Sequence, residues 1–220
     1  LTAPHVSPDD SVLSRITRAG VRATLQRCTE LLQAGNDWAW TGVLEHRVEG
    51  KRALPTGEAW PAAGHDWSSP ASAEQIRAAG LADTSPALWH GLAGWIRPRQ
   101  LVAAQLQTPG VQVLWGQTVA RLHRVSTGEG RWEALDDDGH CIAQASLVVF
   151  AGGYDTLHLL NKLIDEGDQP PVPLNPLRGQ ISFGLTHDLA TALRDHLPPF
   201  PVNGHGSFIS GVPTPDGLPG

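Results

Sequence analysis

A continuous apolar run, Leu147-Val148-Val149-Phe150, is followed directly by Ala151-Gly152-Gly153 and then by a helical pattern over residues 156–164. Such a run suits a strand that is buried on both faces, as in a parallel sheet. Small residues between this strand and the helix would let the backbone of a cofactor come close. An ordinary strand-to-helix turn explains the same residues. The run therefore predicts an α/β fold and leaves the role of the turn open.

The remaining patterns agree with an α/β fold. A first helix is expected from Ser7, which can cap it, with Pro8 at the first helical position and Gly35 as its stop. Asp138-Gly139 is the strongest hairpin signal in the chain. Further helices are expected over 72–79, 100–107 and 188–196, and strands over 38–44, 88–96, 111–114, 118–125, 131–135, 141–145, 180–184 and 208–209.

Composition limits the classes of protein that remain. The chain has 220 residues and a net charge of −6, and no basic patch advertises nucleic acid. Cys28 and Cys141 form neither a CxxC pair nor a disulfide framework, which favours a reducing cytoplasm. No apolar run approaches the roughly 20 residues that span a bilayer, so no membrane partner is expected. The chain has no methionine. We therefore expect a fragment of a longer protein, with a processed whole protein as the alternative.

Side chains that often carry chemistry are scattered. The ten histidines have no metal-ligand spacing, so no metal is expected, and surface or turn positions are favoured for them. The stretch GHGSF around Ser207 does not match the G-x-S-x-G motif of hydrolases. Eight tryptophans occur singly, which favours packing in the core over a stacking platform for nucleic acid.

The sharpest local candidate is Arg178-Gly179, at the start of the predicted strand over 180–184. An arginine entering a buried strand needs an anion or a carboxylate partner, and Gly179 would let a flat group approach the backbone. A structural arginine paired with an aspartate is the alternative. Neither G-x-G-x-x-G nor a P-loop is present in the sequence.

The order of four stretches resembles the flavin-dependent D-amino-acid and glycine oxidase (DAO) superfamily. The stretches are GWIRPRQLVAAQ, GQTVARL, LVVFAGG and NPLRGQISF. SPDDSVLSRITRAGVRATLQR, the GVL strand and PLRGQISFG resemble more narrowly the oxidoreductase domain of the bifunctional tRNA-modifying enzymes of the MnmC family. The resemblance implies an FAD-dependent oxidoreductase that oxidises a secondary amine, with a tRNA wobble uridine as substrate and a fused methyltransferase domain as partner.

The resemblance also implies a fold and a domain order. A partial FAD-binding domain of the Rossmann type would be interleaved with a mixed, mainly antiparallel substrate-domain sheet. Residues 1–36 would form an N-terminal helix, 37–92 and 166–220 the substrate domain, and 93–165 the FAD domain without its G-x-G-x-x-G unit. We expect FAD in the full-length protein, and neither FAD nor activity in the isolated chain.

Site residues follow from the resemblance position by position. Val119 matches the position whose backbone meets the adenine of FAD, and Ala151, Gly152 and Gly153 match the turn that passes near the dinucleotide. Arg178, Gly179 and Gln180 match the strand that enters the substrate domain beneath the flavin. Catalytic residues stay unassigned.

The sequence departs from the family at one position. Ser207 stands where relatives carry a tyrosine that faces the substrate, which puts the substrate or the activity in doubt. Two alternatives to oxidation of modified tRNA therefore stay open. One is an oxidase of free amino acids such as glycine or sarcosine, and the other is a non-catalytic module that has lost the flavin site.

Overall fold

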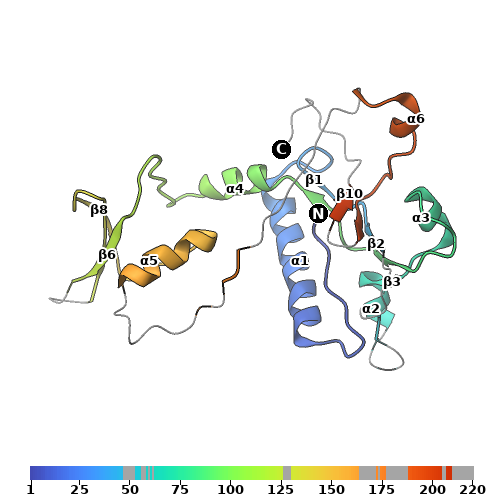
Figure 1. Cartoon of the computed structure of the whole chain (residues 1–220), viewed down its shortest axis with the longest axis horizontal. Coiled ribbons are helices and arrows are strands. Elements are labelled where there is room, and N and C mark those ends of the chain that lie inside the picture. The colour runs from blue at the N-terminus through green and yellow to red at the C-terminus, as the bar shows by residue number, and fades with distance from the viewer. Residues whose placement is uncertain are drawn as a thin grey trace. The chain divides into compact units, whose positions relative to one another are not determined.

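The computed structural model describes residues 1–46, 53–55, 58, 60, 62–125, 130–163, 172, 174–176, 188–204 and 207–209. The chain divides into two compact units (Figure 1). Unit 1 consists of Leu1–Val111 and Ser182–Gly220, and unit 2 is the intervening segment Gln112–Ile181. Helices and several sheets are both present, which confirms the α/β class expected from the sequence.

Helix α1 (Val12–Leu31) is the longest helix of the described residues (Figure 1). It begins later than expected, because Ser7 and Pro8 belong to a turn that the Asp10 N–H closes on the Ser7 carbonyl at 3.1 Å. Ser11 caps the helix by accepting the backbone N–H of Ser14. The prediction of an N-cap at Ser7 was therefore wrong by one turn.

The core of unit 1 forms where one stripe of α1 meets a short strand pair. Strand β1 (Trp38–Ala39) pairs antiparallel with β5 (Trp95–Ile96). Trp38 packs against Val21, Leu25 and Cys28 of α1, and all four side chains are buried. Helix α4 (Pro98–Leu106) begins with proline at its first turn and contacts α1.

A five-stranded sheet makes up the second part of unit 1, in the order β10-β9-β2-β4-β3. The sheet is mixed and mainly antiparallel, since only the β2–β9 pair is parallel. Its strands are β2 (Val43–His46), β3 (Ser69–Pro70), β4 (Ala87–His90), β9 (Val202–Gly204) and β10 (Ser207–Ile209).

Glycine divides an expected strand. The strand predicted over 38–44 is split between β1 and β2, which lie in different sheets. Gly42 separates them with a φ of +73°, and a Cβ at this position would overlap the ring of Trp89. Only glycine satisfies both conditions without strain. The strand predicted over 88–96 is similarly divided into β4 and β5.

Three short helices complete unit 1: α2 (Ala62–Trp67), α3 (Ala73–Ala78) and α6 (Thr191–Arg194). The predicted helix over 72–79 is confirmed as α3, where Ser72 and Gln75 form a capping box. The helix predicted over 188–196 is reduced to α6. Within the described part of the chain, no helix combines the length and the apolar character needed to cross a membrane.

Unit 2 is built on a three-stranded antiparallel sheet. The strands β6 (Arg121–Arg124), β7 (Trp132–Leu135) and β8 (Cys141–Ala145) follow one another in chain order. The predicted turn at Asp138-Gly139 is confirmed between β7 and β8, with Gly139 at a φ of +85°. A 3₁₀ turn, η2 (Gly153–Asp155), leads into α5 (Thr156–Leu163), which contacts β6.

The parallel-type strand predicted over 147–150 is wrong for this structure. These residues form no strand, and the side chains of Leu147 and Val149 are 75% and 78% exposed. An apolar strand needs hydrogen-bonding neighbours and covered faces. Among the described residues of unit 2, β8 pairs only with β7, so nothing extends the sheet to this run. The strand predicted over 111–114 is likewise irregular chain.

Candidate functional site

Ala151, Gly152 and Gly153 form an exposed turn in unit 2, directly before α5. Gly153 has a φ of +60°, in the left-handed region that favours glycine. A Cβ at Gly153 would meet no described heavy atom within 4 Å, so the space beside this backbone is open. A Cβ at Gly152 would lie 3.4 Å from Oγ1 of Thr156. A flat group can therefore approach this turn closely.

Val119 is half-buried and lies just outside the ladder of β6. The next residue, Ala120, joins the sheet by donating its N–H to the Leu135 carbonyl at 2.9 Å. Both parts of the expected cofactor site thus belong to unit 2, where Val119 leads into β6 and the Ala151–Gly153 turn leads into α5. Because α5 contacts β6, the two elements that carry these residues are neighbours.

The substrate-side candidates are only partly described. Arg178, Gly179 and Gln180 lie outside the described residues. Ser207 begins β10, where its backbone pairs with Gly204 of β9. The roles expected for these four residues stay predictions.

Sequence reasoning missed a buried array of three polar side chains in the sheet of unit 1. Oγ of Ser68 lies 2.8 Å from Nδ1 of His90, and Nε2 of His90 lies 3.0 Å from Oε2 of Glu45. The side chain of His90 is fully buried and that of Glu45 is 7% exposed. In the β2–β4 register Val43 opposes His90, so the period of two places Glu45 on the same face as His90.

This array can orient a carboxylate inside the protein. The network assigns the Nε2–H of His90 as donor to Glu45, while Nδ1 accepts the hydroxyl hydrogen of Ser68. Both ring nitrogens are then satisfied, and the imidazole is fixed between β2 and the start of β3. Ser68 has no exposed surface, so its hydroxyl is inaccessible as a nucleophile.

The prediction of surface or turn positions for the histidines is wrong for His90. The signal was a polar residue within an apolar run, LWHGLAGWI, together with Glu45 in the GVLEH strand. Each buried polar side chain needs a partner, but the partners are 45 residues apart and no local pattern joins them.

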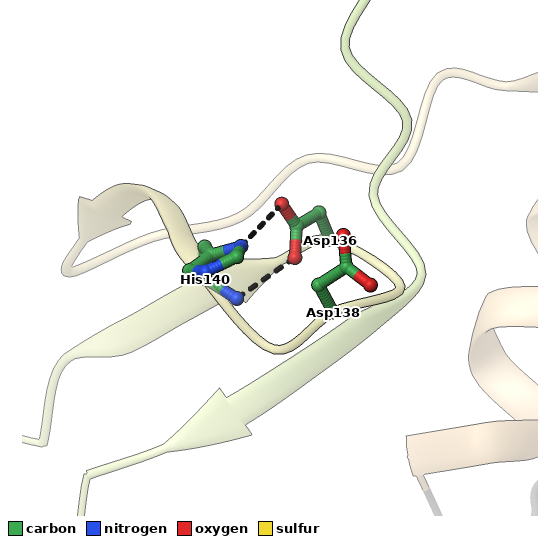
Figure 2. A group of neighbouring side chains, drawn as sticks. All are labelled: Asp136, Asp138 and His140. Carbon is green, nitrogen blue, oxygen red and sulfur yellow. Dashed lines mark hydrogen bonds and ion pairs between the residues drawn. The ribbon is translucent and has the colours of Figure 1, made fainter.

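A second polar group occupies the β7–β8 turn, where ligand atoms of Asp136, Asp138 and His140 lie within 4.8 Å of one another (Figure 2). Both oxygens of Asp136 already accept from His140: one from the backbone N–H at 2.8 Å and the other from Nδ1 at 3.2 Å. The backbone hydrogen bond lowers the pKa of Asp136 most, with the His140 side chain adding to the effect. These bonds account for the arrangement, to which we assign a structural role.

Comparison with known proteins identifies the family. The family described as "FAD dependent oxidoreductase" (DAO) matches residues 2–218. The chain belongs to this DAO family. No solved structure matches the chain.

Several curated relatives of the chain share one name, "tRNA 5-methylaminomethyl-2-thiouridine biosynthesis bifunctional protein MnmC". The protein of Delftia acidovorans is 49% identical, over 98% of this chain and 34% of its own length. The protein of Polaromonas naphthalenivorans is 46% identical, over 98% of this chain and 33% of its own length. The chain therefore spans about a third of the length of these relatives.

Membership of the DAO family implies FAD, and the turn in unit 2 fits part of such a cofactor. The turn is exposed and has no side chain larger than the methyl group of Ala151. At Gly153 the open space would accept an extended dinucleotide against the backbone. The buried Ser68–His90–Glu45 array belongs to unit 1 and offers this cofactor no accessible surface.

Proposed function

We propose that this chain is part of an FAD-dependent oxidoreductase that oxidises a secondary amine on tRNA. The observation that carries the proposal is the 49% identity, over nearly the whole chain, to a protein named for tRNA 5-methylaminomethyl-2-thiouridine biosynthesis. The proposed substrate is the carboxymethylaminomethyl group of a wobble uridine. The word "bifunctional" in the relatives' name supports a second, fused domain, which we propose to be a methyltransferase.

The chemistry requires removal of a hydride from the carbon next to the amine nitrogen. FAD, when bound, supplies the acceptor for that hydride. Water then adds to the resulting C=N bond, and the C–N bond breaks to release glyoxylate and leave the aminomethyl group on the uridine. The protein's part is to hold the C–H bond and the substrate carboxylate in place.

Residues of this chain have proposed roles in that arrangement. The backbone of Val119 would meet the adenine of FAD, and the small turn Ala151–Gly153 would pass beside the dinucleotide. Arg178, Gly179 and Gln180 would form the strand beneath the flavin, with Ser207 on the substrate side. We further propose that residues 93–165 serve the cofactor, that 37–92 and 166–220 serve the substrate, and that the protein is cytoplasmic, which suits its two free cysteine thiols.

The test is release of glyoxylate by the full-length protein. We expect release from tRNA that carries the carboxymethylaminomethyl group and none from free glycine or sarcosine. The reverse preference would support an oxidase of free amino acids. A full-length protein that purifies colourless and cannot be reconstituted with FAD would leave only the non-catalytic module, which Ser207 favours.

Variants can test the substrate side. Arg178→Gln in the full-length protein should raise KM for the modified tRNA, while Arg194→Gln on α6 is the matched control. Separately, the 220-residue chain should carry no flavin absorption band on purification, because its sequence has no G-x-G-x-x-G. A flavin band in that preparation would contradict this expectation.

A further inference from the structure

A groove runs along α1 on the surface of unit 1, with a cavity of about 380 Å³. This volume lies within the range of small-ligand pockets. One wall is a strip of α1, and the other walls are two tryptophans and a leucine. The lining residues from outside α1 are Trp40, Trp67 and Leu92.

Trp40 is an exposed aromatic side chain held in a fixed place. Its side chain belongs to a residue that is 60% exposed, although β1 and the buried Trp38 are adjacent in the chain. The rings of Trp38 and Trp40 meet edge to face, with centroids 5.0 Å apart and an angle of 82° between planes. Because Trp38 is fixed in the core, Trp40 presents a supported ring to the groove, which is what base stacking requires.

Positive charge lies along the same side of α1. Arg22 lines the groove, and Arg15 lies two helical turns before it, about 10.5 Å away along the axis at 1.5 Å per residue. In the part of the chain that the structure describes, neither arginine has an ion-pair partner. Arg18, between them, is neutralised by two hydrogen bonds to Asp10, at 2.7 and 2.9 Å.

The carboxylate that lines the groove is already paired. Oε2 of Glu30 accepts from Arg27 at 2.8 Å, and Oε1 accepts from Gln26 at 3.4 Å. The charge left at the groove is therefore that of Arg22, extended by Arg15. This surface favours an anionic ligand with a flat ring, although the chain as a whole carries a charge of −6.

We propose that this groove, lined by α1, Trp40, Trp67 and Leu92, binds an unpaired segment of the RNA substrate. One base stacks on Trp40, and the phosphates beside it meet Arg22 and Arg15. Single-stranded RNA is typically recognised in this way, by bases on aromatic rings and arginines along the backbone. The inference rests on the proposed function for its choice of RNA, and it adds a binding site away from the cofactor turn.

The test measures the affinity of the full-length protein for a fluorescein-labelled tRNA transcript by fluorescence anisotropy at several salt concentrations. Trp40→Ala should weaken binding about tenfold or more, since one base loses its stacking partner. Trp40→Phe keeps a ring and should restore most of the affinity. The double variant Arg15→Gln/Arg22→Gln should lower the salt dependence by about 1.4, or about 0.7 for each phosphate contact.

Matched controls carry the same substitutions elsewhere. Arg77→Gln alters an exposed arginine of α3, and Trp115→Ala removes a tryptophan of unit 2 that is 79% exposed. Both should change the affinity by less than about twofold, as surface substitutions do. Circular dichroism and the unfolding midpoint verify that each variant is folded. If Trp40→Ala is unfolded, Trp40→Phe and the arginine pair decide the outcome.

Unchanged affinity and salt dependence in the folded groove variants would overturn the proposal. So would a lowered unfolding midpoint with normal RNA binding, because the groove would then be covered by another part of the protein. Glyoxylate release by the wild-type protein from the free modified nucleoside tests the chemistry separately. Oxidation with unaltered RNA binding would remove only the groove, whereas weakened RNA binding without any oxidation would remove only the proposed reaction.

Discussion

Nε2 of His90 lies 3.0 Å from Oε2 of Glu45, and neither side chain has appreciable contact with solvent. The pair joins two neighbouring strands of the unit 1 sheet, and Ser68 satisfies the other ring nitrogen. A buried carboxylate is costly unless it is paired, so the array ties the position of β4 to that of β2. The geometry of the sheet therefore depends on a polar contact in its interior.

His90→Ala should destabilise the 220-residue chain by about 3–5 kcal/mol, because removing one partner leaves the Glu45 carboxylate buried with less compensation. The free energy of unfolding in urea measures the loss. His196→Ala is the matched control, since His196 is exposed and should change stability by less than about 0.5 kcal/mol. Equal losses for the two variants would show that the buried array does not stabilise the fold.

Gly42→Ala should be more damaging than an alanine at another left-handed glycine. Gly42 and Gly80 have φ values of +73° and +71°, so alanine costs about 1–2 kcal/mol at either position. At Gly42 the new methyl group would also overlap the ring of Trp89, which adds about 1–3 kcal/mol. At Gly80 it would meet no described atom within 4 Å. Urea unfolding of both variants isolates the steric contribution, and equal losses would contradict it.

Local signals in the sequence predicted local structure well. Ser72 and Gln75 are three residues apart and form the capping box of α3, and Asp138-Gly139 forms the expected turn between β7 and β8. In each case the residues that decide the conformation are neighbours in the chain. Gly42 shows the limit, because the reason for its turn is the ring of Trp89, 47 positions later.

Non-local structure explains what the sequence did not reveal. The run over 147–150 has the composition of a buried strand, but burial depends on neighbours that unit 2 does not supply among its described residues. His90 and Glu45 meet only because β2 and β4 pair. Trp40 and Arg22 line one groove because Trp38 packs on α1. The cofactor turn at Ala151–Gly153, by contrast, was found from a contiguous motif.

Asp136 should make the β7–β8 hairpin sensitive to acid. Its pKa lies below the ordinary value of 3.8, chiefly because its carboxylate accepts the backbone N–H of His140. A depressed pKa stabilises the folded state above the ordinary value, and this contribution is lost as the pH falls through the folded pKa. Asp136→Asn should therefore lower the thermal midpoint above about pH 4 and match the wild type in stronger acid. A difference that is constant with pH would contradict this account.

The ion pair between Arg18 and Asp10 should contribute more to stability than the pair between Arg27 and Glu30. Both join an arginine of α1 to a carboxylate, but Arg18 and Asp10 are only 17% and 23% exposed, against 42% and 47% for the other pair. Arg18 also binds Asp10 through two nitrogens and lies 5.1 Å from the ring centroid of Trp60.

Double-mutant cycles measure the difference. The cycle of Arg18→Gln with Asp10→Asn should give a coupling of roughly 1–2 kcal/mol, as expected for a charge-assisted, two-point contact. The cycle of Arg27→Gln with Glu30→Gln should give about 0.3–0.5 kcal/mol, the usual value for an exposed helix pair. Added salt should reduce the second coupling more than the first, since exposed charges are screened more strongly. Similar couplings in both cycles would mean that the Arg18 contact gains nothing from its partial burial.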